Sequence, residues 1–453
     1  GERAFKNTKI KYLTIPNSVE YIGPGAFTIS DCVLYNNAYY IGNNSNPYHV
    51  LIEAVNTDIT SCNIHENTKI IYDNAFGNCE QLSEISLPDN LKQIGRNAFR
   101  GSAITSIDIP NSVESIGSRA FSSCSSLTSV TIGNRVTSIG DYVFSSCSSL
   151  TSVTIPDSVT SIGNGAFYEC TGLTSVTVGK GVTAIGDDAF AYSGLSGTVN
   201  IPPRTKSIAG SAFAYCFNLT GFSVEQGNIY YITFNVWGVD NNDLPATVGN
   251  YLVERNLAML VTYPAGIPAN ADPYSIINYG ILSIGEYAFA GSPVYDIYIP
   301  ETVTQVYAHA FEDCYNLTNI RIDSLESWCN IDFETNGLGV LYENTNPIGS
   351  EGRYLYNKTG DELYSDIWIP DAIEVIKSCT FQGYKELTQV NFDAWEARCS
   401  KIENYAFANC TALTSFVYYS EDPSKPIISQ IGEGAFSGCS ALSSISLDST
   451  HVR

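Results

Sequence analysis

The dipeptide Ala-Phe, or a near variant of it, recurs along the chain at an almost constant spacing, and this repeat constrains the fold more than any other feature. Between Phe76 and Phe213 consecutive copies lie 22 or 23 residues apart. A fixed period of this length is the signature of a solenoid, in which each unit buries its apolar face only against its neighbours. The 453 residues are therefore expected to form a stack of coils rather than the roughly three domains that this length would suggest. The fourteen copies end at Phe5, Phe27, Phe76, Phe99, Phe121, Phe144, Phe167, Phe190, Phe213, Phe289, Phe311, Phe381, Phe407 and Phe436.

Residues 150–173 give the clearest unit, Leu-Thr-Ser-Val-Thr-Ile-Pro-Asp-Ser-Val-Thr-Ser-Ile-Gly-Asn-Gly-Ala-Phe-Tyr-Glu-Cys-Thr-Gly-Leu. Val153 and Ile155 alternate with polar residues, as in a short strand with one buried face, and Pro156 ends the strand. The later apolar residues are spaced one, four and seven positions from Ala166, which predicts a short helix with a stripe of Ala166, Phe167, Cys170 and Leu173. Each coil is therefore predicted as strand, turn and short helix.

The run Leu-x-x-Val-x-Ile-Pro-x-x-Val-x-x-Ile-Gly-x-x-Ala-Phe-x-x-Cys at residues 150–170 resembles the BspA-like leucine-rich repeat family. Variants of this run cover most of the chain. The resemblance implies a surface or secreted protein, bacterial or protozoan, of a kind associated with adhesion to host matrix proteins or to other cells.

The predicted fold class is α/β: a curved, right-handed leucine-rich-repeat solenoid whose strand, turn and short-helix coils have about 23 residues. A strand repeats at about 4.8 Å and a helix needs about 10 Å, so such a stack curves with its strands on the concave side. Three β-rich insertions interrupt the repeat, and they either add hairpins to the sheet or continue the core as atypical coils. The expected segments are N-terminal repeats at 1–30, insertions at 31–63, 223–275 and 323–364, regular repeats at 64–222 and 276–322, and C-terminal repeats at 365–453.

The balance of charge excludes several classes of partner. The chain carries 46 acidic and 23 basic side chains, a formal net charge of −23, which argues against a nucleic acid or an anionic membrane surface as ligand. No apolar run approaches the roughly 18 residues of a membrane-spanning helix, so no insertion into a bilayer is expected. Because residue 1 is a glycine inside a repeat, we expect the chain to be a fragment of a longer protein. We also expect it to be monomeric.

Thirteen cysteines in an exported chain would ordinarily suggest a disulfide framework, but their register indicates free thiols. Eight of them fall three residues after the repeat Phe, at a slot that sibling coils fill with Ser, so the slot needs a small buried side chain. Cys62 and Cys399 align with inward slots and are predicted to lie in the core. Cys32 and Cys329 lie in insertions, and the sequence leaves their state open. The eight are Cys79, Cys124, Cys147, Cys170, Cys216, Cys314, Cys410 and Cys439.

The sequence contains no recognisable catalytic or metal-binding constellation. The four histidines do not converge, and the segment Cys62-Asn-Ile-His65 has no second half of a zinc site at a suitable spacing. The cluster from Asp240 to Asp243 resembles a calcium site in composition only, and a polar turn is the simpler interpretation. No phosphate-binding loop, nucleophile elbow or paired-carboxylate motif is present. We therefore predict no enzymatic activity, no cofactor and no metal.

A ligand is expected on the outward slots of the strands, which flank the inward residues. In the middle of the chain these slots hold a ladder of Ser and Thr, as at Ser152 and Thr154, which cross-strand pairing alone can explain. Further along, they hold aromatic and charged residues of the kind that dominates interface hot spots. The alternative is that Tyr298 or Trp368 is covered by the third insertion and serves as satellite core. The candidate binding residues are Asp296, Tyr298, Arg321, Asp366 and Trp368.

Two classes of function follow from these features and from the resemblance. The first is a non-enzymatic cell-surface or secreted module that binds a host or neighbouring-cell protein or glycan. The second is a carbohydrate-binding module or the accessory arm of a larger surface enzyme, because exposed aromatic rings stack on sugars and acidic residues bind hydroxyl groups. A purely structural spacer is a third alternative, and it predicts no ligand at all.

Overall fold

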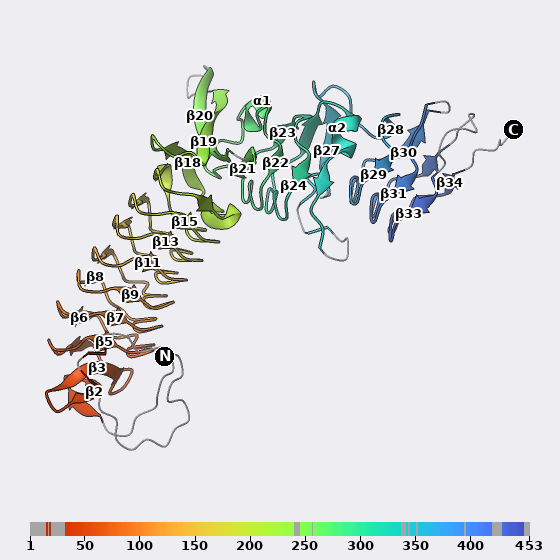
Figure 1. The fold of residues 1–453 in the computed structure, drawn as a ribbon. Helices are drawn as coiled ribbons and strands as arrows, with labels where there is room; N and C mark the ends of the chain where they lie inside the picture. Colours follow the sequence, from red (N-terminus) through yellow and green to blue (C-terminus); the bar gives the residue numbers. More distant parts are fainter. Residues whose placement is uncertain are drawn as a thin grey trace. The chain divides into compact units, whose positions relative to one another are not determined.

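The computed structural model describes residues 15–16, 18–19, 32–239, 245–255, 257–336, 341–342, 345–349, 352–393, 396–418 and 428–447. The chain divides into two compact units, residues 1–231 and 232–453. In each unit, parallel strands of successive coils pair with one another (Figure 1). The repeats that end at Phe5 and Phe27, and the polar cluster from Asp240 to Asp243, lie outside the described residues.

In the first unit every regular coil contributes two strands. The first strand is the predicted one, with Val153 buried between two exposed polar residues, and Val153 pairs in register with Val176 of the next coil. The second strand holds the inward Ile, as where Ile162 pairs with Ile185, in a segment predicted only as a turn. The first strands are β4 (Ser61–Asn63), β6 (Glu84–Ser86), β8 (Ser106–Asp108), β10 (Ser129–Thr131), β12 (Ser152–Thr154), β14 (Ser175–Thr177), β16 (Ser196–Ile201) and β18 (Asn218–Val224). The second strands are β5 (Ile70–Ile71), β7 (Gln93–Ile94), β9 (Ser115–Ile116), β11 (Ser138–Ile139), β13 (Ser161–Ile162), β15 (Ala184–Ile185) and β17 (Ser207–Ile208).

The second unit repeats the two-strand coil and adds two short helices, α1 (Pro273–Ile276) and α2 (Leu325–Cys329). Its first strands are β23 (Asp296–Ile299), β25 (Asn319–Ile322), β27 (Tyr354–Asn357), β28 (Asp366–Ile369), β30 (Gln389–Phe392), β32 (Ser415–Val417) and β34 (Ser444–Ser446). Its second strands are β22 (Ser283–Ile284), β24 (Gln305–Val306), β26 (Asp332–Phe333), β29 (Val375–Ile376), β31 (Lys401–Ile402) and β33 (Gln430–Ile431).

The segment around the repeat Phe is not an α-helix. The residues two before and two after Phe167 have positive φ, 58° at Gly165 and 57° at Glu169, whereas an α-helix needs negative φ at every residue. As a result, the N–H of Phe167 donates to the carbonyl of Ala189 in the next coil, over 2.7 Å. Successive coils are therefore joined at this corner by backbone hydrogen bonds, as neighbouring strands of a sheet are. The predicted short helix and the α/β class are therefore wrong, and each unit is a β-solenoid. Among the described coils of the first unit, one has a 3₁₀ turn at this position, η1 (Gly210–Phe213).

The predicted curvature depends on the predicted helix, which is absent at the Phe corner of the described coils. That prediction needs a helix about twice as wide as the strand spacing. From Phe76 to Phe213 the buried Phe rings instead stack with centroids 5.2–5.4 Å apart and interplanar angles of 3–14°. The Phe corner of the first unit therefore has nearly the same rise per coil as its strands, which repeat at about 4.8 Å.

The cysteine three residues after the repeat Phe has a hydrogen-bonding role as well as a packing role. Except at Cys79, its thiol donates to the carbonyl of the Phe in the preceding coil, as Cys170 does to Phe144 over 3.0 Å. Cys216 makes the same contact with Phe190 over 3.2 Å. Where Ser occupies this slot, as at Ser102 and Ser193, its hydroxyl lies 3.3 Å from the thiol of the cysteine in the next coil, so the slot accepts either small side chain. The predicted free thiols are confirmed here. Cys62, Cys329, Cys379 and Cys399 are also buried and form no disulfide.

Thiol labelling is expected to follow these environments. Burial raises the pKa of the Cys170 thiol to about 12 and that of Cys216 to about 11, so both should stay protonated and unreactive in the native protein. Cys439 is only partly buried, and the neighbouring Cys410 lowers its pKa, so it should be alkylated among the first. Mass spectrometry after brief iodoacetamide treatment checks this order. Unfolding without reductant should expose a large majority of the thiols, and several quantitative disulfides would contradict the prediction.

The three insertions differ in kind, so both alternatives occur. In the first, β1 (Val33–Tyr35), β2 (Ala38–Asn43) and β3 (Asn46–Ala54) are antiparallel neighbours, and β3 pairs in parallel with β5. In the second, β19 (Tyr231–Val239) pairs with β20 (Pro245–Glu254), which runs antiparallel to β21 (Met259–Thr262), and β21 pairs in parallel with β22. In the third, β26 pairs in parallel with β24 and β27 with β25. The first two insertions therefore add hairpins, and the third is an atypical coil.

Candidate functional site

The outward slots of the first strands carry only small hydroxyl side chains in the middle of the first unit. Successive coils place Ser against Ser and Thr against Thr, and these side chains are exposed. The fold therefore requires nothing larger at these slots. The residues concerned are Ser152, Thr154, Ser175 and Thr177.

Asp296 and Arg321, two of the predicted binding residues, bind each other in the second unit. The Nε and Nη2 atoms of Arg321 donate to the two carboxylate oxygens of Asp296, at 2.8 and 2.5 Å. The Arg321 side chain is 20% exposed and the Asp296 side chain 8% exposed. Nη1 of Arg321 donates to the carbonyl of Thr359, in the third insertion, over 2.7 Å. Gly360 follows with φ of 78°, where a Cβ would collide with Arg321, so glycine lets this turn close over the guanidinium.

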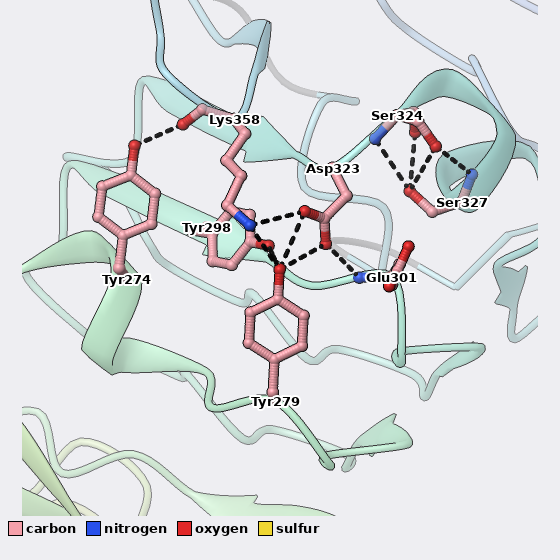
Figure 2. A network of polar contacts seen from close by, with 8 residues as sticks. All are labelled: Tyr274, Tyr279, Tyr298, Glu301, Asp323, Ser324, Ser327 and Lys358. Carbon is pink, nitrogen blue, oxygen red and sulfur yellow. Dashed lines mark hydrogen bonds and ion pairs between the residues drawn. The ribbon is translucent and has the colours of Figure 1, made fainter.

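Tyr298 is a buried member of a polar cluster whose shared atom is the Tyr279 hydroxyl (Figure 2). Its side chain is 1% exposed, and its hydroxyl lies 2.5 Å from the hydroxyl of Tyr279. From the third insertion, Lys358 Nζ donates to the Tyr279 hydroxyl over 2.5 Å and lies 3.0 Å from a carboxylate oxygen of Asp323. The hydroxyl of Tyr274, in α1, donates to the Lys358 carbonyl over 2.5 Å. The expectation of an exposed Tyr298 is therefore wrong, and the alternative, cover by the insertion, holds for this residue.

Local caps hold two members of this cluster in place. The Asp272 carboxylate accepts the N–H of Tyr274 over 3.1 Å and so starts α1. The side chains of Ser324 and Ser327 form a capping box at the start of α2, which Figure 2 shows beside the cluster. That box fixes the chain direction directly after Asp323.

Hydrogen bonds to Asp323 favour its ionised form. Burial by itself would raise the pKa of this carboxyl, but hydrogen bonds from Tyr298, from the N–H of Glu301 and from Lys358 outweigh that effect and lower the pKa. Burial raises the pKa of Tyr298, and its contacts with the Asp323 carboxylate raise it further. At neutral pH the cluster therefore joins a neutral phenol, a carboxylate and an ammonium group.

The cluster is expected to loosen in acid. Because the pKa of Asp323 is lowered in the folded protein, its stabilising effect is complete above about pH 4 and is lost as the pH falls through the lower folded-state pKa. We expect the amide of Glu301, which donates to Asp323 over 2.8 Å, to lose about 1 kcal/mol of protection in acid. Hydrogen exchange, corrected for its intrinsic pH dependence, measures this. In the variant Asp323→Asn the Glu301 amide should already have the lower protection at neutral pH. Unchanged protection of this amide in the wild type in acid would refute the prediction.

Trp368 and Asp366 lie on an open face of the sheet β28–β30–β32–β34. Trp368 is 61% exposed, and the residues in register with it are Asn391 and then Val417, which is 37% exposed. Asp366 is exposed and accepts a hydrogen bond from Asn391 Nδ2 over 2.7 Å. We call the surface made by Asp366, Trp368, Asn391 and Val417 the Trp368 face. It has apolar side chains beside polar groups and no covering segment among the described contacts.

The five predicted residues therefore form two groups rather than one site. Asp296, Tyr298 and Arg321 belong to the closed region under the third insertion, and Asp366 and Trp368 lie on the open face. Tyr274, Tyr279 and Lys358, which complete the first group, were not predicted. For Tyr274 and Lys358 the available signal is a tyrosine and a basic residue inside the insertions of an otherwise acidic chain, whereas Tyr279 lies in a repeat segment and carries no such signal.

The half zinc motif has other partners. The Cys62 thiol donates to the carbonyl of Asn36 over 3.0 Å, and the ring of His65 stacks on Tyr48 at 3.8 Å. Within the described residues, no three His, Cys, Asp or Glu side chains gather into a group that could hold a metal ion. None of the helices in the described part of the chain has the length and apolar character needed to cross a bilayer.

Comparison with known proteins finds a repeat family and a group of solved solenoids. The sequence matches the family described as BspA type leucine rich repeat region (6 copies), over residues 1–48, 54–156, 137–238, 274–338 and 353–453. No curated protein matches the chain.

Three solved structures illustrate the likeness. A leucine rich cell surface protein of Faecalibacterium prausnitzii A2-165 is 23% identical, with a TM-score of 0.53 over 92% of this chain and 94% of that one. A leucine-rich repeat protein of Bacteroides ovatus ATCC 8483 is 18% identical, with a TM-score of 0.41 over 96% and 86%. The pneumococcal vaccine antigen PcpA is 14% identical, with a TM-score of 0.44 over 92% and 88%. The first of these shows a shared fold.

Proposed function

Because this chain belongs to the BspA-type leucine-rich repeat family, we propose that it is a non-enzymatic protein-binding module, located at a cell surface or secreted. The observation that carries the proposal is the 61% exposure of Trp368 at an outward strand slot. The description of the Faecalibacterium prausnitzii structure as a cell surface protein supports the location. The partner is a protein of a host or of a neighbouring cell, and the role is adhesion.

Fold maintenance does not explain Trp368. The equivalent slot holds Thr154 in the regular coil, where it is exposed and supports the same strand pairing. An exposed indole adds apolar surface in water, which is unfavourable unless a partner covers it. Trp is also among the residue types most enriched in interface hot spots.

The surroundings of Trp368 have the composition of a small interface centre. Val417 extends the apolar surface two strands away, and Asp366 and Asn391 supply polar groups beside the indole. Interfaces combine an apolar centre with a polar rim in this way. With a formal net charge of −23 on the chain, we expect the partner to present a neutral or basic surface.

The variant Trp368→Thr tests the proposal, since Thr is the residue that a sibling coil carries at this slot. Binding to a panel of purified extracellular-matrix and cell-surface proteins is measured by biolayer interferometry. For each protein that binds, the variant is expected to lose about 2 kcal/mol or more of affinity, because a desolvated Trp anchor is lost. The melting temperature should stay unchanged.

The matched control is Tyr315→Ser, which removes another aromatic residue, 85% exposed, from outside the Trp368 face. It should bind like the wild type. Full affinity in Trp368→Thr combined with reduced stability would show that the indole is core, and the proposed site would be abandoned. Absence of binding to every protein of the panel would favour the spacer alternative.

A further inference from the structure

Four consecutive coils of the first unit form a cleft with a volume of about 580 Å³ beside the Phe corner. Each coil contributes the residues two and four places after its repeat Phe, from Phe144 to Phe213. We propose that this cleft binds a neutral saccharide. The proposal is independent of the Trp368 face, which lies in the other unit.

The aromatic residues of the cleft are unexplained by the fold. Tyr192 and Tyr215 are the only aromatic residues two places after the repeat Phe among the described coils, and both have positive φ, 57° and 59°. A bulky residue in this conformation is strained, and the equivalent slot in a sibling coil holds Ser146. Their rings stack at 4.3 Å with an interplanar angle of 8°. Tyr215 is buried, but Tyr192 is 37% exposed and Phe217, which packs edge-on against Tyr215, is 58% exposed, so the outer part of this aromatic surface faces water.

One of the four coils carries a glycine in the wall of the cleft. Four places after the repeat Phe, neighbouring coils carry Ser148, Thr171 and Phe217, whereas the third of the four coils carries Gly194. A Cβ at Gly194 would collide with the backbone oxygen of Thr171. Glycine therefore lets this coil approach the backbone of the preceding coil closely, and it leaves one slot of the cleft wall without a side chain.

The polar lining selects an uncharged ligand with many hydroxyl groups. The carboxylate of Glu169 is exposed and accepts from Ser146 Oγ over 3.0 Å. The exposed side chains of Ser148, Thr171 and Asn218 add hydroxyl and amide groups at the rim. No lysine or arginine lines the cleft, so a phosphate or carboxylate ligand would meet Glu169 without compensation.

This combination fits a saccharide better than a peptide. The C–H face of a pyranose packs against an aromatic ring, while its hydroxyl groups both donate to carboxylates and amide oxygens and accept from hydroxyl groups. The coils present the lining at intervals close to those of their stacked Phe rings, 5.3–5.4 Å. That interval is similar to the length of one sugar unit in an extended oligosaccharide, so successive units can meet successive coils.

Saturation-transfer NMR and calorimetry on the whole chain test the proposal with four neutral disaccharides: maltose, lactose, cellobiose and N,N′-diacetylchitobiose. At least one is expected to bind. The double variant Tyr192→Ser/Phe217→Ser places at both slots the residue that a sibling coil already carries there, at Ser146 and Ser148. It should keep the wild-type melting temperature and lose affinity at least about tenfold, because both stacking surfaces are gone.

Two controls make the result specific. Tyr315→Ser removes an exposed aromatic residue from the same repeat slot as Phe217, four places after Phe311, but outside the cleft, and it should bind the disaccharide like the wild type. Trp368→Thr should also leave this binding unchanged. The proposal is overturned if none of the four disaccharides binds, if the double variant retains full affinity, or if either control loses as much affinity as the double variant does.

Discussion

Replacing Phe167 by Ala is expected to lower the free energy of unfolding of the first unit by about 3–5 kcal/mol, the cost of a large cavity in a packed core. The Phe167 side chain is fully buried, and its ring centroid lies 5.4 Å from that of Phe144 and 5.3 Å from that of Phe190. Each coil is stabilised by its two neighbours alone. The loss should therefore be local, with the coils on both sides of the cavity fraying before the rest of the unit.

Equilibrium unfolding in urea measures the size of the loss. Hydrogen exchange of the native protein, read in peptides from 140–195, shows which coils fray. The control is Phe217→Ala, which deletes the same side chain from a position that is 58% exposed and should change the stability by no more than about 0.5 kcal/mol. An unchanged unfolding curve for Phe167→Ala would contradict the ladder of buried rings as a source of stability.

Replacing Asp296 by Ser is expected to destabilise the second unit by about 3 kcal/mol, because it leaves the Arg321 guanidinium mostly buried without its counter-charge. The bidentate contact, 2.8 and 2.5 Å, is lost, and the remaining hydrogen bond to the Thr359 carbonyl does not neutralise the charge. The turn at 357–360 should open as a result. Hydrogen exchange in peptides covering β25 and this turn reports the change.

The double variant Asp296→Ser/Arg321→Thr separates charge burial from packing. It restores at both slots the small hydroxyl residues of the first unit, as at Ser152 and Thr154. We expect it to be more stable than Asp296→Ser alone, since no unpaired charge remains. If the double variant were less stable than the single one, the role of Asp296 as counter-charge would be refuted.

Spacing alone was enough to predict the coils, their first strands and the cysteine slot, because all three repeat with the Phe. The second strand escaped prediction because two residues, such as Ser161 and Ile162, are too few to show alternation. The helix was predicted in error because an apolar stripe at one, four and seven positions also suits a turn with alternating left-handed residues. The informative signal lay beside the Phe, where Asn and Gly, as at Asn97 and Gly101, favour positive φ.

The candidate site was predictable only in part. Alternation along each strand correctly assigned Trp368 to an exposed slot. It could not distinguish Trp368 from Tyr298, since both occupy outward slots and only the second is covered. That cover depends on Tyr274 and Lys358, whose positions are set by the tertiary placement of α1 and of the turn at 357–360. The cleft around Tyr192 escaped because its residues occur at slots that were assigned to a helix.

The hydrogen bonds between coils, at both strands and at the Phe corner, run along the direction of stacking. A pulling force along that direction loads the junctions in series, and because each coil contacts only its neighbours, the junctions can break one at a time. Every coil that peels away releases about 80 Å of chain, for 22 or 23 residues at about 3.5 Å each. A tethered molecule of this construction lengthens in small increments under load and dissipates work at each one, so that the attachment at its far end experiences a limited peak force.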